Sequence, residues 1–437
     1  MDYFNKQLKE SSGMMNILEF LKNNISPYHL VARVKEELIK NDFIELNVYE
    51  KWTLEKGRKY FYIKNDASLV AFKLPNDQAN LKYIISASHV DHPTFKVKPQ
   101  NKIEHNNNFY VNTSPYGGLI LSTFFDRPLS IAGRVFVNEN GVIKNKLVNF
   151  DRDLMIIPSL PIHFGKVTEP NPQTDMLPIM SLESENSSVD DLLKKEAKIE
   201  NYVSYDLFLY NCDEYKIFGA NNEFLGGVGL DDALGVFTSL VGFIRANDSN
   251  NINVLYLTNN EEVGSMSNTG ADSNVLDVAI KRINKLYNLT DEEQEIALAK
   301  SLLISVDNAH AFNNNFASKY DNTNRVYLNK GVVIKHSANM LYTTDAISNA
   351  MFKSCLDKKQ IPYQEFVNRS DIRGGSTLGA ILLSHVSINS IDIGLPQLAM
   401  HSAYETSGLK DIDYMIDAIK AMYEADFIFK EGQIIIR

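Results

Sequence analysis

Short apolar runs recur along the chain, and several end abruptly in residues that bind metals or transfer protons. Three of them have the length and apolar content of buried strands: 252–258 before Glu261-Glu262, 83–88 before His89, and 302–306 before Asp307. In open α/β sheets, ligands bind beyond the carboxyl ends of the strands. The pattern therefore predicts a site built from strand ends.

The remaining apolar residues recur at helical spacing or form further strand-like runs. Helices are expected at 14–21, 30–39, 233–246, 291–300 and 413–425, and further strands at 59–63, 68–74, 332–334 and 388–393. Ser26-Pro27 separates the first two helices and can start the second, because serine caps helices and proline suits their first turn. The mixture indicates an α/β fold, a mixed sheet with helices on both faces.

The pattern of apolar and polar residues changes between residues 95 and 226. This part has Asn-rich turns, short β-like runs at 119–124, 129–137 and 203–209, and a polar segment at 183–198. We interpret 95–226 as an inserted, mostly β domain. Residues 1–94 and 227–437 then form one discontinuous catalytic domain, and two domains suit a chain of 437 residues.

Composition excludes several classes of protein. The net charge of −10 without long runs of one sign argues against nucleic-acid and anionic-membrane partners. Two cysteines give neither a disulfide framework nor a thiolate zinc cluster. Residues 1–10 lack an apolar signal core, and no run is long enough to span a membrane. A cytoplasmic protein is expected.

Adjacent carboxylates can divide two tasks, because one can hold a metal while the other takes a proton from water. Glu261 and Glu262 suit this division, although a solvated acidic loop is the commoner meaning of such a pair. In His89-Val90-Asp91 the aspartate can orient the histidine from behind, but this spacing alone also arises by chance. By its chemistry alone, His163 favours a structural hydrogen bond.

Two glycine-rich turns add to the candidate site. Asp231 and Asp232 follow the turn 226–229 and can cap the next helix, or one of them can bridge two cations. The turn 370–379 includes Gly375 and Ser376 and can present backbone N–H groups to an anion or a substrate. It has neither the phosphate-loop nor the dinucleotide-binding spacing.

Imidazole and carboxylate donors without thiolates suit zinc, manganese or cobalt at a catalytic site. The candidates are His89, Asp231, Glu261 or Glu262, Asp307 and His401. They suffice for two metals that share one carboxylate, at a separation of roughly 3.5–4 Å.

Ordered motifs along almost the whole chain point to one family. They include SPYH at 26–29, HVDHP at 89–93, YGG at 116–118, LDD at 230–232, EEVGS at 261–265, DNAHA at 307–311, GGSTLG at 374–379 and PQLAMHS at 396–402. With these motifs the chain resembles a bacterial-type member of the aspartyl aminopeptidase family of dinuclear zinc metallopeptidases.

The resemblance implies a role for each matching residue. His89 and Asp307 would hold one metal, Glu262 and His401 the other, and Asp231 would bridge them. Glu261 would be the general base, Asp91 would orient His89, and Lys335 would meet an acidic N-terminal side chain of the substrate. His163 would reach a partner's site and stabilise the oxyanion. The family implies a tetrahedral homododecamer built from dimers, with the inserted domain as the dimerisation domain.

We therefore expect a metal-dependent aminopeptidase that removes an N-terminal Asp or Glu from peptides through a metal-bridging water. Gly229 and Arg373 depart from residues common in the family, which leaves open an aminopeptidase of neutral preference. The sequence also leaves open a related dinuclear deacylase and a non-catalytic assembly or cargo protein.

Overall fold

The computed structural model describes residues 15–77, 80–182 and 188–437. Three sequence-based expectations fall partly or wholly outside these ranges. They are the charged segment 1–10, the start of the first helix at Met14, and the first part of the polar segment, 183–187.

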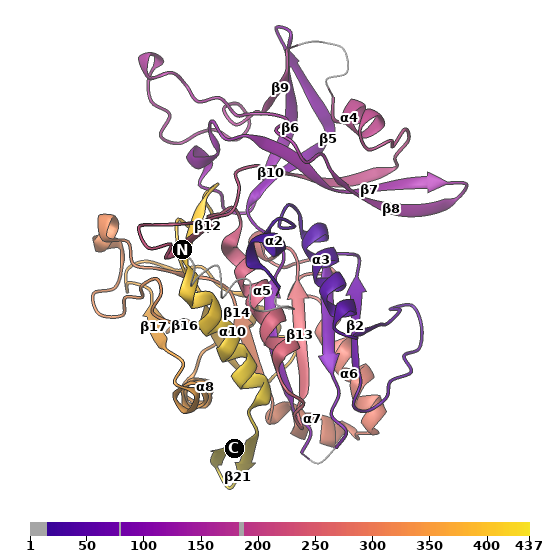
Figure 1. Cartoon of the computed structure of the whole chain (residues 1–437), viewed down its shortest axis with the longest axis vertical. Helices are drawn as coiled ribbons and strands as arrows, with labels where there is room; N and C mark the ends of the chain where they lie inside the picture. The colour runs from indigo at the N-terminus through magenta and orange to yellow at the C-terminus, as the bar shows by residue number, and fades with distance from the viewer. Residues whose placement is uncertain (1–14, 78–79, 183–187) are drawn as a thin grey trace.

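A nine-stranded mixed sheet forms the centre of the lower lobe in Figure 1. The strand order is β1 (Ile44–Glu45), β2 (Lys59–Lys64), β3 (Ser68–Lys73), β13 (Ile252–Thr258), β4 (Tyr83–His89), β14 (Leu302–Val306), β18 (Asn389–Gly394), β16 (Val332–His336) and β17 (Tyr363–Val367). The central strands β13, β4, β14 and β18 are parallel. Their carboxyl ends therefore lie at one edge of the sheet.

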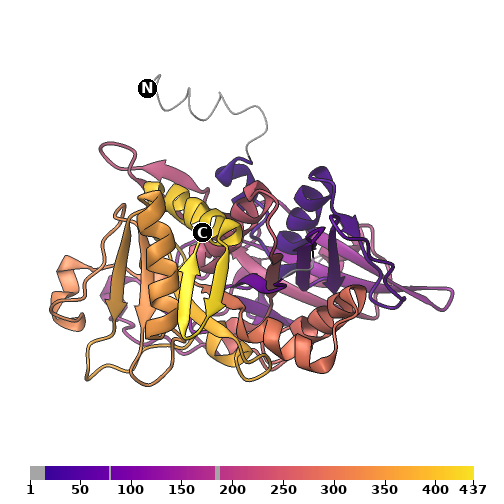
Figure 2. The ribbon, with the colours of Figure 1, turned by 90° about the horizontal axis from the view of Figure 1, so that it is seen from below.

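Helices cover both faces of this sheet (Figure 2), as the sequence predicts. One face carries α2 (Ile17–Leu21), α3 (Pro27–Lys40), α5 (Leu230–Arg245), α8 (Ala346–Lys359) and α10 (Leu409–Glu424). The other carries α6 (Val275–Tyr287), α7 (Asp291–Ala299) and α9 (Leu378–Leu382). Successive side chains of β13 alternate between the two cores: Leu255 packs under α5, and Tyr256 packs under α6.

A six-stranded antiparallel sheet forms the upper lobe in Figure 1. Its order is β8 (Val142–Asn149), β7 (Leu129–Glu139), β10 (Ser204–Asn211), β5 (Thr94–His105), β6 (Asn108–Tyr116) and β9 (Ile179–Ser181). It has its own apolar core, to which the helix α4 (Val189–Lys195) contributes. The chain leaves the nine-stranded sheet after β4 and returns to it with β13.

Two small sheets complete the structure. One has the order β11 (Lys216–Phe218), β12 (Phe224–Gly227), β20 (Glu405–Gly408), β19 (Pro396–Leu398) and β15 (Ala309–His310). The other is the C-terminal hairpin of β21 (Phe427–Lys430) and β22 (Gln433–Ile436). Through β19 and β20, the first of these sheets holds the segment of His401 beside the edge of the main sheet.

Two local expectations are wrong. The β-like run 119–124 instead contains the 3₁₀ helix η1 (Leu121–Phe124), with Phe124 packed edge-on against Phe95. Asp231 and Asp232 do not cap α5: the residue before the helix is Gly229, neither aspartate side chain accepts a hydrogen bond from its first turn, and both aspartates have non-helical backbone angles. Their side chains are buried between α5 and the sheet edge, which makes them available to the site.

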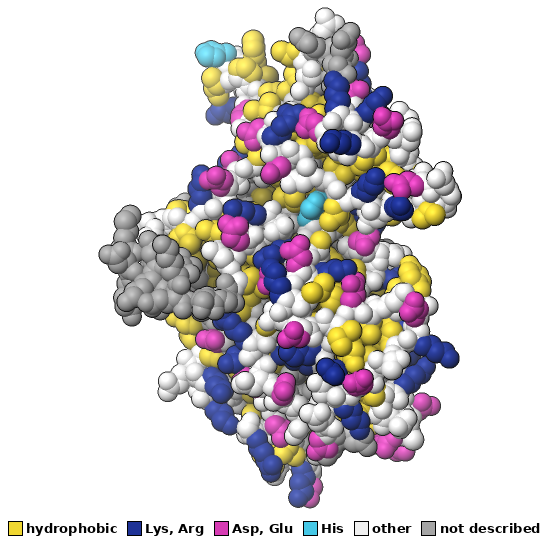
Figure 3. Space-filling model, turned by 45° about the vertical axis from the view of Figure 1, so that its right-hand side comes forward, with side chains coloured by type: hydrophobic (Ala, Val, Ile, Leu, Met, Phe, Trp, Pro, Cys, Tyr) yellow, Lys and Arg dark blue, Asp and Glu magenta, His cyan; other side chains and the backbone are white. Residues whose placement is uncertain are grey.

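Within residues 15–77, 80–182 and 188–437, no helix is long and apolar enough to cross a membrane. On the face seen in Figure 3, basic and acidic side chains are interspersed without a large patch of one sign. This face lacks the one-sided positive charge that phosphate backbones and anionic lipids attract.

Candidate metal centre and active site

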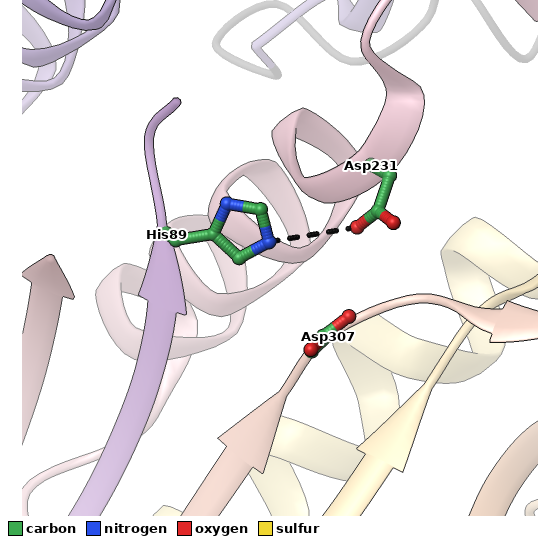
Figure 4. Close-up of side chains that lie close together, drawn as sticks. All are labelled: His89, Asp231 and Asp307. Atoms are coloured by element: carbon green, nitrogen blue, oxygen red, sulfur yellow. Dashed lines mark ion pairs between the residues drawn. The ribbon is translucent and has the colours of Figure 1, made fainter. Parts of the chain in front are cut away.

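Three buried side chains meet at the carboxyl edge of the central sheet (Figure 4). His89 ends β4, Asp307 follows β14, and Asp231 lies at the start of α5. One ligand atom of each lies within 4.8 Å of the others, and His89 Nε2 is 3.6 Å from Asp231 Oδ1. This geometry follows from parallel strands that end at the same level.

A second group of donors shares Asp231 with the first. His401 Nε2 lies 3.3 Å from Glu262 Oε2 and 3.9 Å from Asp231 Oδ2. The two oxygens of Asp231 thus face two different histidines. A carboxylate in this position can bridge two cations, as zinc, manganese and cobalt sites with several metals require.

Glu261 and Glu262 lie in the short 3₁₀ helix η3 (Glu261–Val263) directly after β13. Asn260 before them has a left-handed backbone (φ 62°), which turns the chain sharply at the strand end. Glu261 comes within 4.8 Å of a ligand atom of His89 and of Glu262, but it is absent from both groups that contain Asp231. Of the two glutamates, only Glu262 belongs to a donor group that contains Asp231.

Asp91 braces this turn. Its carboxylate accepts hydrogen bonds from the backbone N–H groups of Glu261 and Glu262, both at 3.2 Å, and from the Tyr116 hydroxyl at 2.8 Å. The nearest partner of His89 Nδ1 is the Asp91 carbonyl oxygen at 2.9 Å, whereas the Asp91 carboxylate is 3.6 Å away. The expected orientation of His89 by Asp91 thus includes a main-chain bond, which leaves Nε2 for a metal.

The YGG motif at 116–118 brings the backbone close to two candidate ligands. Gly117 has a positive φ of 81°, and a Cβ there would lie 3.1 Å from Glu262 Cβ. The Gly118 carbonyl accepts a hydrogen bond from His401 Nδ1 at 2.9 Å, which directs Nε2 of that ring toward Glu262. Glycine therefore lets the backbone reach two candidate ligands at once.

The sequence reasoning missed Glu405, which is buried at the start of β20. Its carboxylate accepts hydrogen bonds from the backbone N–H of His401 at 2.6 Å and of Asp231 at 3.2 Å. It therefore links the backbones of two candidate ligands. The available signal was a lone acidic residue within four residues of His401, in a segment otherwise free of charge.

The candidate substrate residues lie in two different settings. Lys335 on β16 is 2% exposed, and its ammonium lies 3.6 Å from Asp307 Oδ1 and donates to the Asn308 carbonyl at 3.1 Å. Gly375 and Ser376 are exposed in the turn between β17 and α9. Lys335 thus contacts the candidate metal cluster directly.

His163 does not join the cluster of its own chain. It lies in the 3₁₀ turn η2 (Ile162–Phe164) of the upper lobe and is exposed. No hydrogen bond or ion pair joins its ring to any other residue that the structure describes. The structural hydrogen bond favoured on chemical grounds is therefore absent from the described part of this chain.

The cluster concentrates negative charge. Burial, together with the carboxylates of Asp307, Asp91 and Asp231, raises the pKa of Glu261 to about 8 against the opposing effect of His89. Burial and nearby acids likewise raise the pKa of Asp307 to about 6 and that of Glu262 well above its ordinary range. Carboxylates held this close favour protons or cations between them.

The donor set fits divalent metal ions. Asp231 Oδ1 and Glu262 Oε1 are buried and accept no hydrogen bond. Burial raises the pKa of Asp231, but the hydrogen bond and charge of His89, with His401 and Lys335, outweigh it and hold that pKa below its ordinary value. For Asp231, a buried and ionised carboxylate with an oxygen that accepts no hydrogen bond is the expected state of a metal ligand.

A mixed sheet between two helical layers, with imidazole and carboxylate donors gathered at its carboxyl edge, defines a zinc-peptidase-like metallohydrolase. The family model described as aminopeptidase I zinc metalloprotease (M18) matches residues 20–423. A probable M18 family aminopeptidase 2 of Clostridium novyi (strain NT) is 42% identical over 421 residues, which cover 93% of this chain and 97% of that protein. The chain belongs to the M18 family.

Solved structures agree with this assignment. The chain matches Ape4, solved in complex with Nbr1, at a TM-score of 0.88 and 30% identity over 93% of this chain and 84% of that one. It matches the S. cerevisiae mApe1 dodecamer at 0.82 and 25% over 93% and 95%. The resemblance to zinc metallopeptidases is thereby confirmed, and the chain is a metal-dependent aminopeptidase that hydrolyses peptide bonds.

Proposed function

We propose that this aminopeptidase uses two metal ions and prefers an acidic N-terminal residue, Asp or Glu. The observation that carries the two-metal part is the position of Asp231, whose two oxygens face two separate histidines. His89 and Asp307 would hold one ion, and Glu262 and His401 the other. Zinc fits the family, and manganese or cobalt would suit the same donors.

The reaction divides between the cluster and Glu261. Bound ions would lower the pKa of the attacking water and polarise the scissile carbonyl. Glu261 takes the proton of that water and returns it to the leaving amine. Asp91 holds the backbone of this turn, so that the Glu261 carboxylate is fixed beside the ligands.

Lys335 supports the acidic preference. It is a buried cation beside the cluster, and the pKa of its ammonium is raised because Asp307 and nearby anions outweigh its burial. A substrate carboxylate near Lys335 would gain a charge-assisted hydrogen bond. Backbone N–H groups of the exposed residues Gly375 and Ser376 would hold the substrate.

Self-association would complete the site. His163 lies between two apolar side chains that are unusually exposed, Ile162 at 68% and Phe164 at 79%. This turn is suited to bury itself against a second copy, where His163 would donate a hydrogen bond to the oxyanion. The solved yeast relative is a dodecamer, and we propose a tetrahedral homododecamer built from dimers for this chain.

The proposed domains follow from this assignment. Residues 1–94 and 227–437 form the catalytic domain, and 95–226 form an inserted dimerisation domain. The separate apolar core of the six-stranded sheet supports the division.

The test measures amino-acid release from dipeptides that differ in the first residue. Chelated protein is reloaded with Zn²⁺, Mn²⁺ or Co²⁺, and wild type is compared with Glu261→Gln. We expect Glu261→Gln to lose at least about 100-fold in kcat while retaining its metals, because the general base is removed and the ligands are not. The exposed Glu295→Gln on α7 is the matched control.

Lys335→Ala in the same panel tests the specificity. The preference for Asp and Glu over Asn and Gln should disappear, with neutral substrates cleaved at a similar rate. An unchanged preference would contradict the proposed role of Lys335 in binding the acidic side chain. If the metal-bound oligomer releases nothing from peptides but cleaves N-acyl amino acids, the protein is a deacylase and not a peptidase. If it is inactive on both kinds of substrate, a role in assembly is favoured.

A further inference from the structure

A cavity of about 630 Å³ opens near the cluster, and apart from Gly375 its lining consists of residues to which no role has been assigned so far. Its walls come from the 3₁₀ helix η4 (Asn314–Lys319) and the loop after it, from the end of β17, and from the turn before α9. This volume is in the range of sites that hold a small ligand or a few residues of a peptide.

The lining is strongly cationic in a chain whose net charge is negative. It contains Lys319, Arg325, Arg369 and Arg373, against the single carboxylate of Asp321. The Asp321 carboxylate accepts hydrogen bonds from the N–H groups of Thr323 and Asn324 in its own turn, at 2.9 and 2.8 Å. It is therefore held by the loop and not by the four cations.

Two of the cations are fixed by the protein, and two are available. Arg325 donates to the Asp321 carbonyl at 2.9 Å and lies over the Phe312 ring at 4.4 Å, while Arg369 pairs with Asp371 at 2.7 Å. Lys319 and Arg373 are exposed, and neither has an ion pair or a side-chain hydrogen bond with any residue in the described ranges. The cavity thus offers two uncommitted positive charges.

The cavity lies near the candidate metal cluster. Its wall includes Gly375 of the substrate turn and His310, which follows the candidate ligand Asp307 by three residues. Three residues of chain span at most about 11 Å. The Phe366 ring, also in the wall, packs against both His310 and Tyr342, the ring beneath Lys335. The second and third residues of a bound peptide could therefore reach this cavity.

We propose that this cavity binds a carboxylate of the peptide beyond the scissile bond, through Lys319 and Arg373. The inference rests on the proposed aminopeptidase function and extends it to the leaving part of the substrate. Two sources share this chemistry: the C-terminal carboxylate of a short peptide and an acidic side chain at the second or third residue. Arg and Lys are the side chains that recognise carboxylates in this way.

The experiment compares kcat/KM on matched peptides with one fixed N-terminal residue. Asp-Ala-Ala is set against its C-terminal amide, and amidated Asp-Ala-Glu against amidated Asp-Ala-Gln. The holoenzyme is assayed as wild type, as Lys319→Gln/Arg373→Gln, and as Lys194→Gln, an exposed lysine on α4 used as control. The first pair reports on the C-terminal carboxylate and the second on the acidic side chain.

Wild type and the control should favour at least one carboxylate-bearing peptide by roughly tenfold, as expected for a charge-assisted hydrogen bond. The double variant should lose this preference. It should keep the wild-type kcat/KM on amidated Asp-Ala-Ala and amidated Asp-Ala-Gln, which lack the additional carboxylate. Arg373→Lys, which retains the charge, should keep the preference and so separates binding from folding.

Three results would overturn the inference. Wild type that does not distinguish the peptides, a double variant that loses activity equally on all of them while Arg373→Lys is normal, or a double variant that keeps the full preference of wild type would each exclude it. The proposed function fails separately, if wild type releases no N-terminal residue from any of these peptides.

Discussion

At the scale of single residues, the two candidate histidine ligands are each held by a second contact. The other ring nitrogen of His89 faces the Asp91 carbonyl, and that of His401 faces the Gly118 carbonyl. Such outer partners fix the ring orientation and the tautomer, so that only one nitrogen faces the metal. Asp91 does more than this, because its carboxylate also holds the turn that carries Glu261, the proposed general base.

Asp91→Asn tests this bracing. Burial raises the pKa of Asp91, but the hydrogen bond and charge of His89 and the bonds from Tyr116 and Glu261 keep it below its ordinary value, so the wild-type group is ionised. An amide can accept at only one of its two ends. We expect kcat to fall by roughly 10- to 100-fold.

The graded control is Tyr116→Phe, which removes one hydrogen bond to Asp91 and leaves the two backbone bonds in place. It should lose much less activity than Asp91→Asn. Equal losses in the two variants would show that the backbone bonds to Glu261 and Glu262 are not what matters.

Much of the candidate site could be predicted from residue types at strand ends. His89, Glu262 and Asp307 follow apolar runs, and the structure does bring them to one edge. Glu405 could not be found in this way, because its function depends on backbone N–H groups from segments far apart in the sequence. The unpartnered state of His163 within the described residues likewise depends on tertiary structure, which no local pattern encodes.

At the scale of elements, the strands that hold the site also stabilise the fold. Ile304 lies in the middle of β14, fully buried, and packs in the core beneath α5 and α10. Ile304→Ala should lower the free energy of unfolding by about 2–5 kcal/mol, because it removes buried methyl groups and leaves a cavity.

Denaturant unfolding of the holoenzyme measures this loss. The control is Ile296→Ala on α7, where the side chain is 45% exposed and the change should cost far less. Similar losses for the two variants would contradict the buried position of β14 in the sheet.

Strands that are buried on both faces of the sheet are the elements predicted most accurately from the sequence. The boundaries of β13 and β14 match the apolar runs residue for residue, because every residue of both strands is buried on the two faces of the sheet. The run 119–124 is also largely apolar but contains a 3₁₀ helix, since packing of Phe124 against Phe95 decides its shape. A short apolar run alone does not distinguish these outcomes.

At the scale of the whole molecule, the buried acids make metal-free protein sensitive to pH. The pKa of Glu261 is raised to about 8 and that of Asp307 to about 6, so the folded state binds these protons more tightly than the unfolded chain does. Their contribution to stability is present below their ordinary pKa and is lost as the pH rises through the raised values. Metal-free protein should therefore melt at lower temperature at pH ~8 than at pH ~5.

Added zinc should reverse this trend. The metal replaces the protons, so the gain in melting temperature on adding zinc should grow between pH ~5 and pH ~8. Scanning calorimetry at both pH values, with chelator or with zinc, measures the gain. A zinc gain that shrinks with rising pH would contradict the clustering of these carboxylates around the metal.

The proposed ligands are scattered along the sequence, from His89 to His401, with the bridging Asp231 between them. Each is supplied by a different segment, and the six-stranded sheet is inserted between the first two. A ribosome-bound fragment that ends before residue 401 would lack part of the second metal site. Filling of the proposed second site must therefore wait until residue 401 has been synthesised, and a truncated product of translation would lack part of the proposed donor set.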